Sequence, residues 1–489
     1  MVSEPDAATT RAWTAIGGSP DLTGQVSYRS AGRVLPAVLP VRELARATVG
    51  ACSLAAAELL AARNGGPVPD VEVDEGAVAT AFVSERHLLV DGRAPTPFAP
   101  LSGFWRAADG WVRTHANYPH HRARLLAALG IDAGEGQGRS AAGGAGPGPG
   151  SGTGTGPEDD RGARLVGRLT ERLAALGAQE IQDTVYAAGG LAVAVAPAPE
   201  REIGTGSTAH GLPLVEAADV GDAGGRPLPS APLPASGVRV LDLTRVIAGP
   251  VATRTLALLG ADVLRVDSPG LPEDPDSHID TGFGKRSALV DLDSAEGRHA
   301  FARLLDSADV VVTGYRPGAL DRYGLMAEAL VARRPGLVVA QLCAWGWSGP
   351  WSERRGFDSL VQAARGIAAI EADRSDPTGR PGALPAQALD HGTGYLLAAG
   401  VLRALADRQA DGRGRVLRFS LAGTADWLLH GIAPEPVGGG GYDAAGWLAE
   451  TPSPFGLLRY ALPPVHYRGA PGTWAAPPAR WGTDTAHWA

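Results

Sequence analysis

The sequence has almost no lysine and very few cysteines. Of its 44 basic residues only Lys285 is a lysine, a scarcity that an arginine- and alanine-rich coding bias explains without saying why this one remains. The two cysteines, Cys52 and Cys343, lie far apart in the sequence, which excludes a disulfide framework and a cysteine-rich zinc site. So few cysteines fit a reducing compartment, and we expect a cytoplasmic protein.

Positive charge is not in excess, and long apolar runs are missing. The formal net charge of -8 argues against a nucleic-acid-binding protein, which needs a basic surface. No stretch of about 18 residues is both apolar and free of charge, so no membrane span is expected. The first residues, MVSEPDAATTRAW, contain acids and lack the apolar region of a signal peptide.

Glycine and proline are abundant and indicate domain boundaries. The 489 residues suffice for two or three domains. Residues 133–160 are mostly small, so we interpret them as a disordered surface insertion that cannot bury enough apolar area to fold. Residues 221–237 are rich in proline and indicate an extended linker.

Short apolar strands alternate with helices after this linker. The pattern predicts an α/β fold with a doubly wound, Rossmann-like parallel sheet. A helix is expected from Pro250, because proline suits the first turn, and a long helix is expected over 389–408. The expected strands are VRVLDL (238–243), ADVLRVD (261–267), ADVVVTGY (308–315) and LVVAQL (337–342).

The amino-terminal part is predicted to be more helical than the later part. It also contains a segment whose sequence is similar to a segment of the later part. RELARATVGACSLAAAELLAAR (42–63) predicts one long helix. Residues 39–63 align without gaps on 384–408, which indicates a partial duplication. In this alignment Ala45 stands where the later copy has Asp390.

The turn after the first strand of the regular part has the features of an anion site. The helix amino terminus at Gly249-Pro250 offers free N–H groups to a negative group. The G-x-G-x-x-G loop of NAD enzymes is absent, so a Rossmann dehydrogenase is not expected. An ordinary strand-to-helix turn is the alternative interpretation.

Two basic clusters lie near the ends of predicted strands. Lys285 and Arg286 share one turn after two glycines, and Arg316 and Arg322 flank a Pro-Gly turn beside Tyr315. Each cluster alone is more typical of a solvated basic turn. Together they favour the binding of a phosphorylated adenine carrier.

A third group of residues lies in ALDHGTGYLL. Asp390 stands at the start of the expected helix, where the helix dipole keeps its carboxylate ionised; a plain N-cap aspartate is the alternative. Gly392 and Gly394 cost helix stability, which makes sense if a ligand approaches the first turn closely. Neighbouring helix positions point about 100° apart, so His391 is not expected to form a dyad with Asp390. No metal-spaced ligand set occurs, and no metal is expected.

The order of these segments resembles the family III CoA-transferases, a family that includes formyl-CoA transferase and α-methylacyl-CoA racemase. The matching segments are VLDLTRVIAGPVATRTLALLGADVLRVDSPG, GKRSALVDLDSAEGR, ADVVVTGYRPGALDRYGL, WGWSGPWSERRGFDSLVQAARGI and ALDHGTGYLLAAGVLRAL, within residues 233–430. The resemblance implies a large Rossmann-like α/β domain joined to a smaller α+β domain.

The amino-terminal part resembles the later half of the same family. FAPLSGFWRAADGWVRTH resembles the start of the family's small domain, and RLTERLAALGAQEIQDTVYAAGGLAVAV resembles its end. We therefore expect a rearranged member, in which the trailing half of one copy precedes the leading half of another. The expected parts are a helical partial large-domain repeat lacking the nucleophile (1–94), a small α+β domain with the insertion (95–220), the linker (221–237), a CoA-binding catalytic large domain (238–430), and a glycine-rich loop with a C-terminal return segment (431–489).

The resemblance implies that Asp390 is the catalytic residue and that coenzyme A, as acyl-CoA, is bound. A glycine-rich loop covers the active site in the transferases, and GGGG at 438–441, with Gly439 and Gly440, is its expected equivalent. A CoA contact would also explain the one lysine. The expected CoA-binding residues are Val246, Ile247, Ala248, Lys285, Tyr315, Arg316, Ala319, Arg322 and Trp345.

The implied function is acyl-CoA:carboxylate CoA transfer through an aspartyl-acyl anhydride and an aspartyl-CoA thioester. Its partners are acyl-CoA and a carboxylic acid, and family members form interlocked homodimers. Two alternatives stay open: an acyl-CoA racemase or isomerase, and a non-catalytic CoA-binding scaffold. Phe357 stands where the racemases carry a histidine, which argues against exchange of a proton between two groups. Ser268 and Gly314 also depart from the family pattern.

Overall fold

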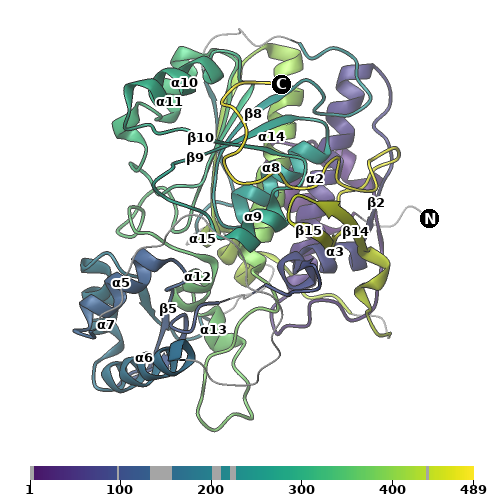
Figure 1. Ribbon diagram of the computed structural model, residues 1–489. Coiled ribbons are helices and arrows are strands. Elements are labelled where there is room, and N and C mark those ends of the chain that lie inside the picture. The colour runs from purple at the N-terminus through teal and green to yellow at the C-terminus, as the bar shows by residue number, and fades with distance from the viewer. Residues whose placement is uncertain (1–4, 96–97, 133–156, 201–210, 221–226, 437–439) are drawn as a thin grey trace. The chain divides into compact units, whose positions relative to one another are not determined.

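The computed structural model describes residues 5–95, 98–132, 157–200, 211–220, 227–436 and 440–489 (Figure 1). The chain forms two compact units. The larger contains Met1–Pro97, Glu200–Val361 and Leu384–Ala489, and the smaller contains Phe98–Pro199 with Gln362–Ala383. The amino-terminal segment therefore shares a compact unit with most of the expected catalytic domain.

The larger unit is built on a seven-stranded sheet with the order β10-β9-β8-β11-β12-β13-β7 (Figure 1). Six strands run parallel, and β7 pairs antiparallel with β13. The α/β class is confirmed, but the sheet is mixed rather than purely parallel, because residues 216–220 add an antiparallel edge. The strands are β7 (Glu216–Val220), β8 (Arg239–Leu243), β9 (Asp262–Asp267), β10 (Arg286–Leu289), β11 (Val310–Thr313), β12 (Val338–Cys343) and β13 (Gly414–Ser420).

The central strands are continuous β-branched or apolar runs because helices cover both faces of the sheet. All four residues of β11 are buried. Successive side chains point to opposite faces, so Val311 packs with Phe301 and Leu330 in one core cluster. In Figure 1, α10 and α11 lie on this face, and α8 and α14 lie on the other. The helices are α8 (Ala248–Leu258), α9 (Pro275–Thr281), α10 (Ala295–Leu305), α11 (Ala327–Arg333), α12 (Asp358–Ala364), α14 (Ala388–Asp411) and α15 (Leu421–Asp426).

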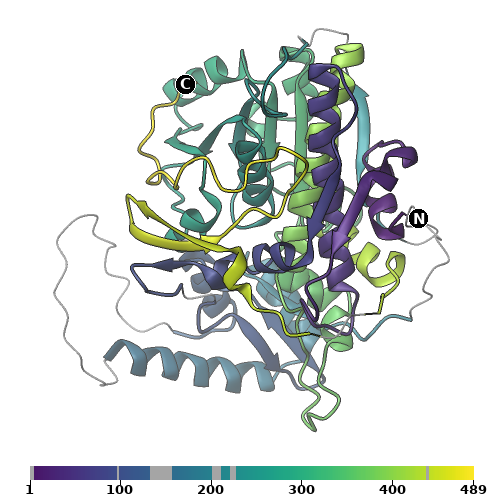
Figure 2. The same cartoon turned by 90° about the vertical axis from the view of Figure 1, so that its right-hand side faces the viewer.

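The two longest helices, α2 (Val41–Asn64) and α14, lie side by side (Figure 2). They run in the same direction, because Leu44 lies against Gly392 near both starts and Glu58 pairs with Arg403 at 3.3 Å further along. By length and composition α2 could cross a membrane, but 83% of its most apolar window is buried inside the protein. That is the environment of a core helix.

The starts of these two helices have nearly the same backbone geometry. Pro40, before α2, has φ −74° and ψ 61°, and Gln387, before α14, has φ −74° and ψ 64°. Both helices have 24 residues and both are followed by a glycine. This geometry places Glu43, rather than Ala45, at the helical position of Asp390.

The amino-terminal segment forms a sheet together with strands from the C-terminal part of the larger unit. Its strand β3 (Leu89–Val90) pairs with β15 (Gly456–Ala461), which also pairs with β14 (Leu448–Ser453). The remaining elements of this segment are α1 (Ala7–Ala15), β1 (Val26–Arg29), β2 (Val71–Asp74), α3 (Glu75–Ala81) and α4 (Ser84–His87).

The smaller unit is an antiparallel three-stranded sheet packed against helices. Its strand order is β4-β5-β6, and its core includes Val112, Leu125, Leu169 and Ile181. Of the expected insertion, residues 133–156 lie outside the described residues, and its last four residues begin a helix instead. The elements are β4 (Gly103–Arg106), β5 (Trp111–Thr114), β6 (Ala192–Ala194), α5 (Pro119–Ala128), α6 (Pro157–Ala174), α7 (Ala178–Ala187) and α13 (Ile367–Ile370).

Helix packing explains one of the two glycines in the first turns of α14. A Cβ at Gly394 would lie 2.6 Å from the Ala248 carbonyl oxygen of α8, which is too close. A Cβ at Gly392 would lie no closer than 3.5 Å to Leu44, an ordinary contact. The close approach expected of a ligand at Gly394 is thus made by α8.

These distances predict opposite effects for two alanine substitutions. Gly394→Ala should lower the free energy of unfolding by about 1–3 kcal/mol through overpacking. Gly392→Ala should raise it by up to about 1 kcal/mol through helix propensity. Urea denaturation of both variants measures this difference, and equal shifts in the two would contradict it.

Candidate active site

Asp390 is a buried carboxylate in the first turn of α14, with only 6% of the residue exposed. Its backbone N–H donates to Oδ2 of Asp358 at 3.0 Å, so Asp358 caps the helix from the first turn of α12. Among the described residues, no ion pair or hydrogen bond to the Asp390 carboxylate oxygens is found. A carboxylate buried in this way is not stabilised by a nearby cation.

Burial raises the pKa of Asp390 well above its ordinary value, and the carboxylates of Asp358 and Glu85 raise it further. The shift of this pKa is therefore opposite to the one expected from the helix dipole. A helix terminus contributes roughly 0.3–1 kcal/mol at an exposed site. Desolvation and two like charges outweigh that contribution here.

The His391 ring lies against the amino-terminal segment. Its Nε2 lies 3.6 Å from Oε2 of Glu85 in α4, a distance that makes an ion pair only when the histidine is protonated. Its ring stacks on Phe82, with centroids 5.3 Å apart. Asp390 and His391 therefore form no dyad.

The loop between β8 and α8 is strained at Val246. This β-branched residue has φ 72°, in the left-handed region that such residues rarely adopt. Arg245 before it pairs with Glu273 at 3.3 Å, and Glu273 in turn pairs with Arg265 at 3.0 Å. Residues with such a strained backbone conformation concentrate at ligand-binding sites. Ala248, where this loop joins α8, lies against Gly394 of α14.

The loop after β11 lies beside the loop after β8, because the two strands are neighbours in the sheet. A Cβ at Gly314 would lie 3.5 Å from Thr244. Burial raises the pKa of Tyr315 to about 12, and the charge of Arg245 is the largest effect that opposes this shift. The structure thus brings Tyr315 together with the loop that contains Val246, Ile247 and Ala248.

The remaining residues of the β11 loop are more open. The Arg322 side chain is 69% exposed, lies 3.6 Å from Asp293 and stacks on Tyr323. Arg316 and Ala319 are half-buried. No side-chain ion pair or hydrogen bond of Arg316 is found among the described residues. This loop therefore presents positive charge at the carboxyl edge of the sheet.

Lys285 is a buried structural cation and not a surface charge. Its side chain is 2% exposed, and its Nζ donates to Asp242 (3.1 Å), the Pro250 carbonyl (2.9 Å) and Thr253 (2.5 Å). Burial lowers its pKa to about 8, although Asp242 acts to raise it. All three donors of the ammonium are engaged, so no donor is left for a phosphate.

Trp345 and Gly440 both make hydrogen bonds within the protein. Trp345 follows β12 and is buried; its indole N–H donates to the Arg355 carbonyl at 3.1 Å. Gly439 lies outside the described residues. The Gly440 carbonyl accepts from the backbone N–H of Arg33 at 3.4 Å, in the amino-terminal segment.

Two residues of the site, Asp358 and Glu85, were not singled out from the sequence. Asp358 lies within a segment that carries the family resemblance, and an acid at the start of a helix is a common cap. Glu85 has no sequence signal, because its approach to α14 joins segments about 300 residues apart.

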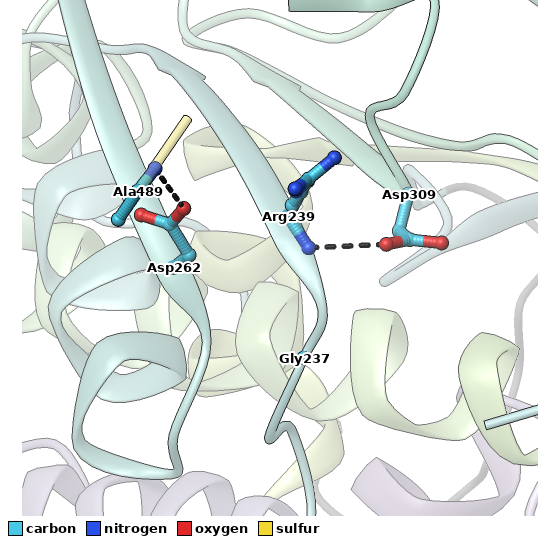
Figure 3. A pocket seen from close by; sticks show the side chains of 5 residues that line it. All are labelled: Gly237, Arg239, Asp262, Asp309 and Ala489. Atoms are coloured by element: carbon cyan, nitrogen blue, oxygen red, sulfur yellow. Dashed lines mark hydrogen bonds between the residues drawn. The ribbon is translucent and has the colours of Figure 1, made fainter. Parts of the chain in front are cut away.

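The described residues hold no cluster of three or more histidines, cysteines or carboxylates that fits a metal ion. A polar pocket lies at the opposite, amino-terminal edge of the sheet (Figure 3), lined by Gly237, Arg239, Asp262, Asp309 and Ala489. Its groups bond one another: Arg239 N–H donates to Asp309 and Ala489 N–H to Asp262, both at 3.1 Å. This pocket is therefore separate from Asp390.

The raised pKa of Asp390 makes a prediction for stability against pH. Because the folded pKa lies above the unfolded value of 3.8, ionising Asp390 costs stability; the cost is absent below that value and grows as pH rises above it. Asp390→Asn should therefore be more stable than the parent protein at neutral pH, and the difference should vanish in acid.

Melting temperatures across pH measure this effect, with Asp411→Asn as a control of opposite sign. Burial acts to raise the pKa of Asp411, but the bond to Arg415 holds it below the ordinary value. Asp411→Asn should therefore lose stability at neutral pH. An Asp390→Asn protein that is less stable than the parent at neutral pH would contradict the account.

Comparison with known proteins finds relatives over the part of the chain that contains Asp390. The profile of CoA-transferase family III matches residues 235–461. A Mycobacterium tuberculosis protein named "Probable fatty acyl-CoA transferase" is 36% identical over 201 residues, which are 38% of this chain and 50% of that protein. Formyl-CoA:oxalate CoA-transferase of Rhodopseudomonas palustris is 34% identical over 192 residues, or 37% of this chain and 44% of the enzyme.

A crystal structure of a Mycobacterium tuberculosis protein is 35% identical and covers 40% of this chain and 56% of its own, with a TM-score of 0.38. The chain spans about half the length of the curated relatives it matches. The match contains both strand-end loops and Asp390. Residues 235–461 of this chain are therefore similar to CoA-transferase family III.

Proposed function

We propose that this protein is an acyl-CoA:carboxylate CoA-transferase in which Asp390 is the nucleophile. The observation that carries the proposal is the buried Asp390 carboxylate, which no cation among the described residues neutralises. The position equivalent to it in α2 provides a contrast. Glu43 is also buried, but it pairs with Arg42 at 2.9 Å and accepts the Glu435 backbone N–H at 3.0 Å.

The sheet supports a nucleotide-containing substrate. The six parallel strands, in the order β10-β9-β8-β11-β12-β13, have the arrangement of doubly wound dinucleotide-binding sheets. In this arrangement the strand order reverses between β8 and β11. Ligands of such sheets bind at the carboxyl ends of the strands at this reversal. The strained loop at Val246 and the basic loop at Arg316 and Arg322 both lie there.

In this proposal Val246, Ile247 and Ala248 line the CoA, while Tyr315, Arg316, Ala319 and Arg322 contact it. Lys285 acts indirectly, because its ammonium ties the Pro250 carbonyl and Thr253 of α8 to Asp242 of β8. A compact ammonium satisfies three converging acceptors that a planar guanidinium would not. This role accounts for the one lysine without a phosphate contact.

The chemistry proceeds by exchange at a single carboxylate. An Asp390 oxygen attacks the thioester carbonyl, the carbon–sulfur bond breaks, and CoA leaves as a thiolate. The thiolate attacks the aspartyl carbonyl of the resulting anhydride, which gives an aspartyl-CoA thioester and releases the first acid. The acceptor carboxylate then attacks this thioester and displaces the thiolate, and the thiolate returns to the new acyl carbonyl, restoring Asp390.

The environment of Asp390 suits these steps. A carboxylate with a raised pKa is a stronger nucleophile once it is ionised. Burial keeps water from the anhydride, which would otherwise hydrolyse. Binding of CoA positions the thioester, an effect worth on the order of 7–11 kcal/mol in well-oriented reactions. The cation-free burial of Asp390 also favours an enzyme over a scaffold, because a scaffold gains nothing from this destabilising group.

A homodimer in the cytoplasm completes the proposal. Cys52 and Cys343 are both buried free thiols, which supports a reducing compartment. The names of the relatives indicate acyl-CoA donors of several kinds, and we propose acyl-CoA and a carboxylic acid as the substrates of this chain.

Substitution of Asp390 tests the proposal. Asp390→Ala should lower the rate of CoA transfer from acyl-CoA to a carboxylate by at least about 10³-fold, since no other group can form the covalent intermediate. Binding of acyl-CoA, measured by calorimetry, should persist. Asp411→Asn, at the other end of α14, should transfer at the parent rate, and undiminished transfer by Asp390→Ala would reject the mechanism.

A further inference from the structure

We propose that the amino-terminal segment completes the active site within the same chain, with Glu85 as a positioning residue for Asp390. This inference rests on the proposed function and adds a residue to it. It is carried by the geometry of α4, which the fold presents to the first turn of α14 from a segment about 300 residues away in the sequence.

Short buried contacts anchor α4. Ser84 Oγ donates to Oδ2 of Asp280 in α9 at 2.7 Å, and both side chains are buried. The Asp280 carbonyl accepts from Nη1 of Arg254 in α8 at 2.6 Å. The helix that carries Glu85 is thereby tied to α8, the helix that follows the strained loop at Val246.

This anchored segment covers the start of α14. Phe82 stacks on His391 and on Tyr395, with ring centroids 5.3 and 5.8 Å apart. Glu85 then lies 3.6 Å from Nε2 of His391. The aromatic stack and the bond of Ser84 thus hold this segment beside the start of α14, where Glu85 Oε2 faces His391.

Charged groups reach Asp390 from three elements. Asp358 approaches from α12, Glu85 from α4, and His391 is its neighbour on α14. Burial acts to raise the pKa of Glu85, but His391 and a backbone hydrogen bond act against it, and the net pKa lies below the ordinary value. Arg86 acts in the same direction. Glu85 therefore stays negative at pH values where Asp390 is still protonated.

A fixed negative charge beside the nucleophile has two consequences. It keeps Asp390 basic, and hence reactive once ionised. It also favours acylation, because the acyl-aspartyl group is neutral and its formation removes the repulsion among Asp390, Asp358 and Glu85. Glu85 thus acts through Asp390 and forms no bond to the substrate.

The pH dependence of CoA transfer tests this role. In Glu85→Gln, the midpoint of the rise of the transfer rate with pH should move to lower pH by on the order of one unit, since a like charge is removed. Glu85→Asp has a shorter side chain that places the negative charge farther from Asp390, so it should move the midpoint in the same direction by a smaller amount. Glu58→Gln, a carboxylate on α2 that pairs with Arg403 far from Asp390, should leave it unchanged.

A role in folding alone would change the rate at every pH without moving the midpoint. An unmoved midpoint in either folded Glu85 variant, with an active parent protein, overturns the role of Glu85 and leaves the proposed function intact. A parent protein that transfers no CoA at any pH, across acyl-CoA donors that it binds, overturns both.

Discussion

The burial of one carboxylate without a cation is the constraint on which the rest of the active site depends. Asp390 lies in a site where desolvation and two neighbouring acids all disfavour its charge. Several other buried acids of the larger unit are paired with a cation, among them Glu43 with Arg42, Asp242 with Lys285, and Asp280 with Arg254. Most buried charges in proteins are neutralised in this way. Asp390, without a cation, lies near a strained loop at the carboxyl edge of the sheet, which is where an acyl-CoA would bind.

The framework that holds this carboxylate is a parallel pair of long helices. The α2 helix packs along α14, and α8 crosses α14 so closely that its Ala248 carbonyl leaves room only for a glycine at 394. These contacts fix the first turn of α14 from two sides, and α4 covers it from a third. The amino-terminal segment therefore serves as part of the wall of the site, although the helix it contributes carries an ion-paired glutamate where the other carries Asp390.

Much of the fold could be predicted from the sequence. The strands β8, β9, β11 and β12 and the helices α2 and α14 follow from apolar runs and periodicity, which are local properties. The edge strand β7 has no such pattern, with two acids and two exposed alanines in EAADV, so only its pairing with β13 reveals it. Asp390 was identifiable through the family resemblance. Its charge state was not, because the dipole of its own helix is local, while Asp358 and Glu85 approach through tertiary contacts. The burial of Lys285 was hidden for the same reason: three acceptors that enclose it come from β8 and α8.

Chemical trapping of the covalent intermediate tests the central claim most directly. The protein would be incubated with acyl-CoAs of different chain length and quenched with hydroxylamine, which converts an acyl-aspartyl or aspartyl-CoA group into a stable hydroxamate. Peptide mass spectrometry then locates the modified residue. The account predicts a hydroxamate at Asp390 that depends on acyl-CoA and is not found at Glu43. Binding of acyl-CoA with no modification at Asp390, or with modification at another carboxylate, would contradict it.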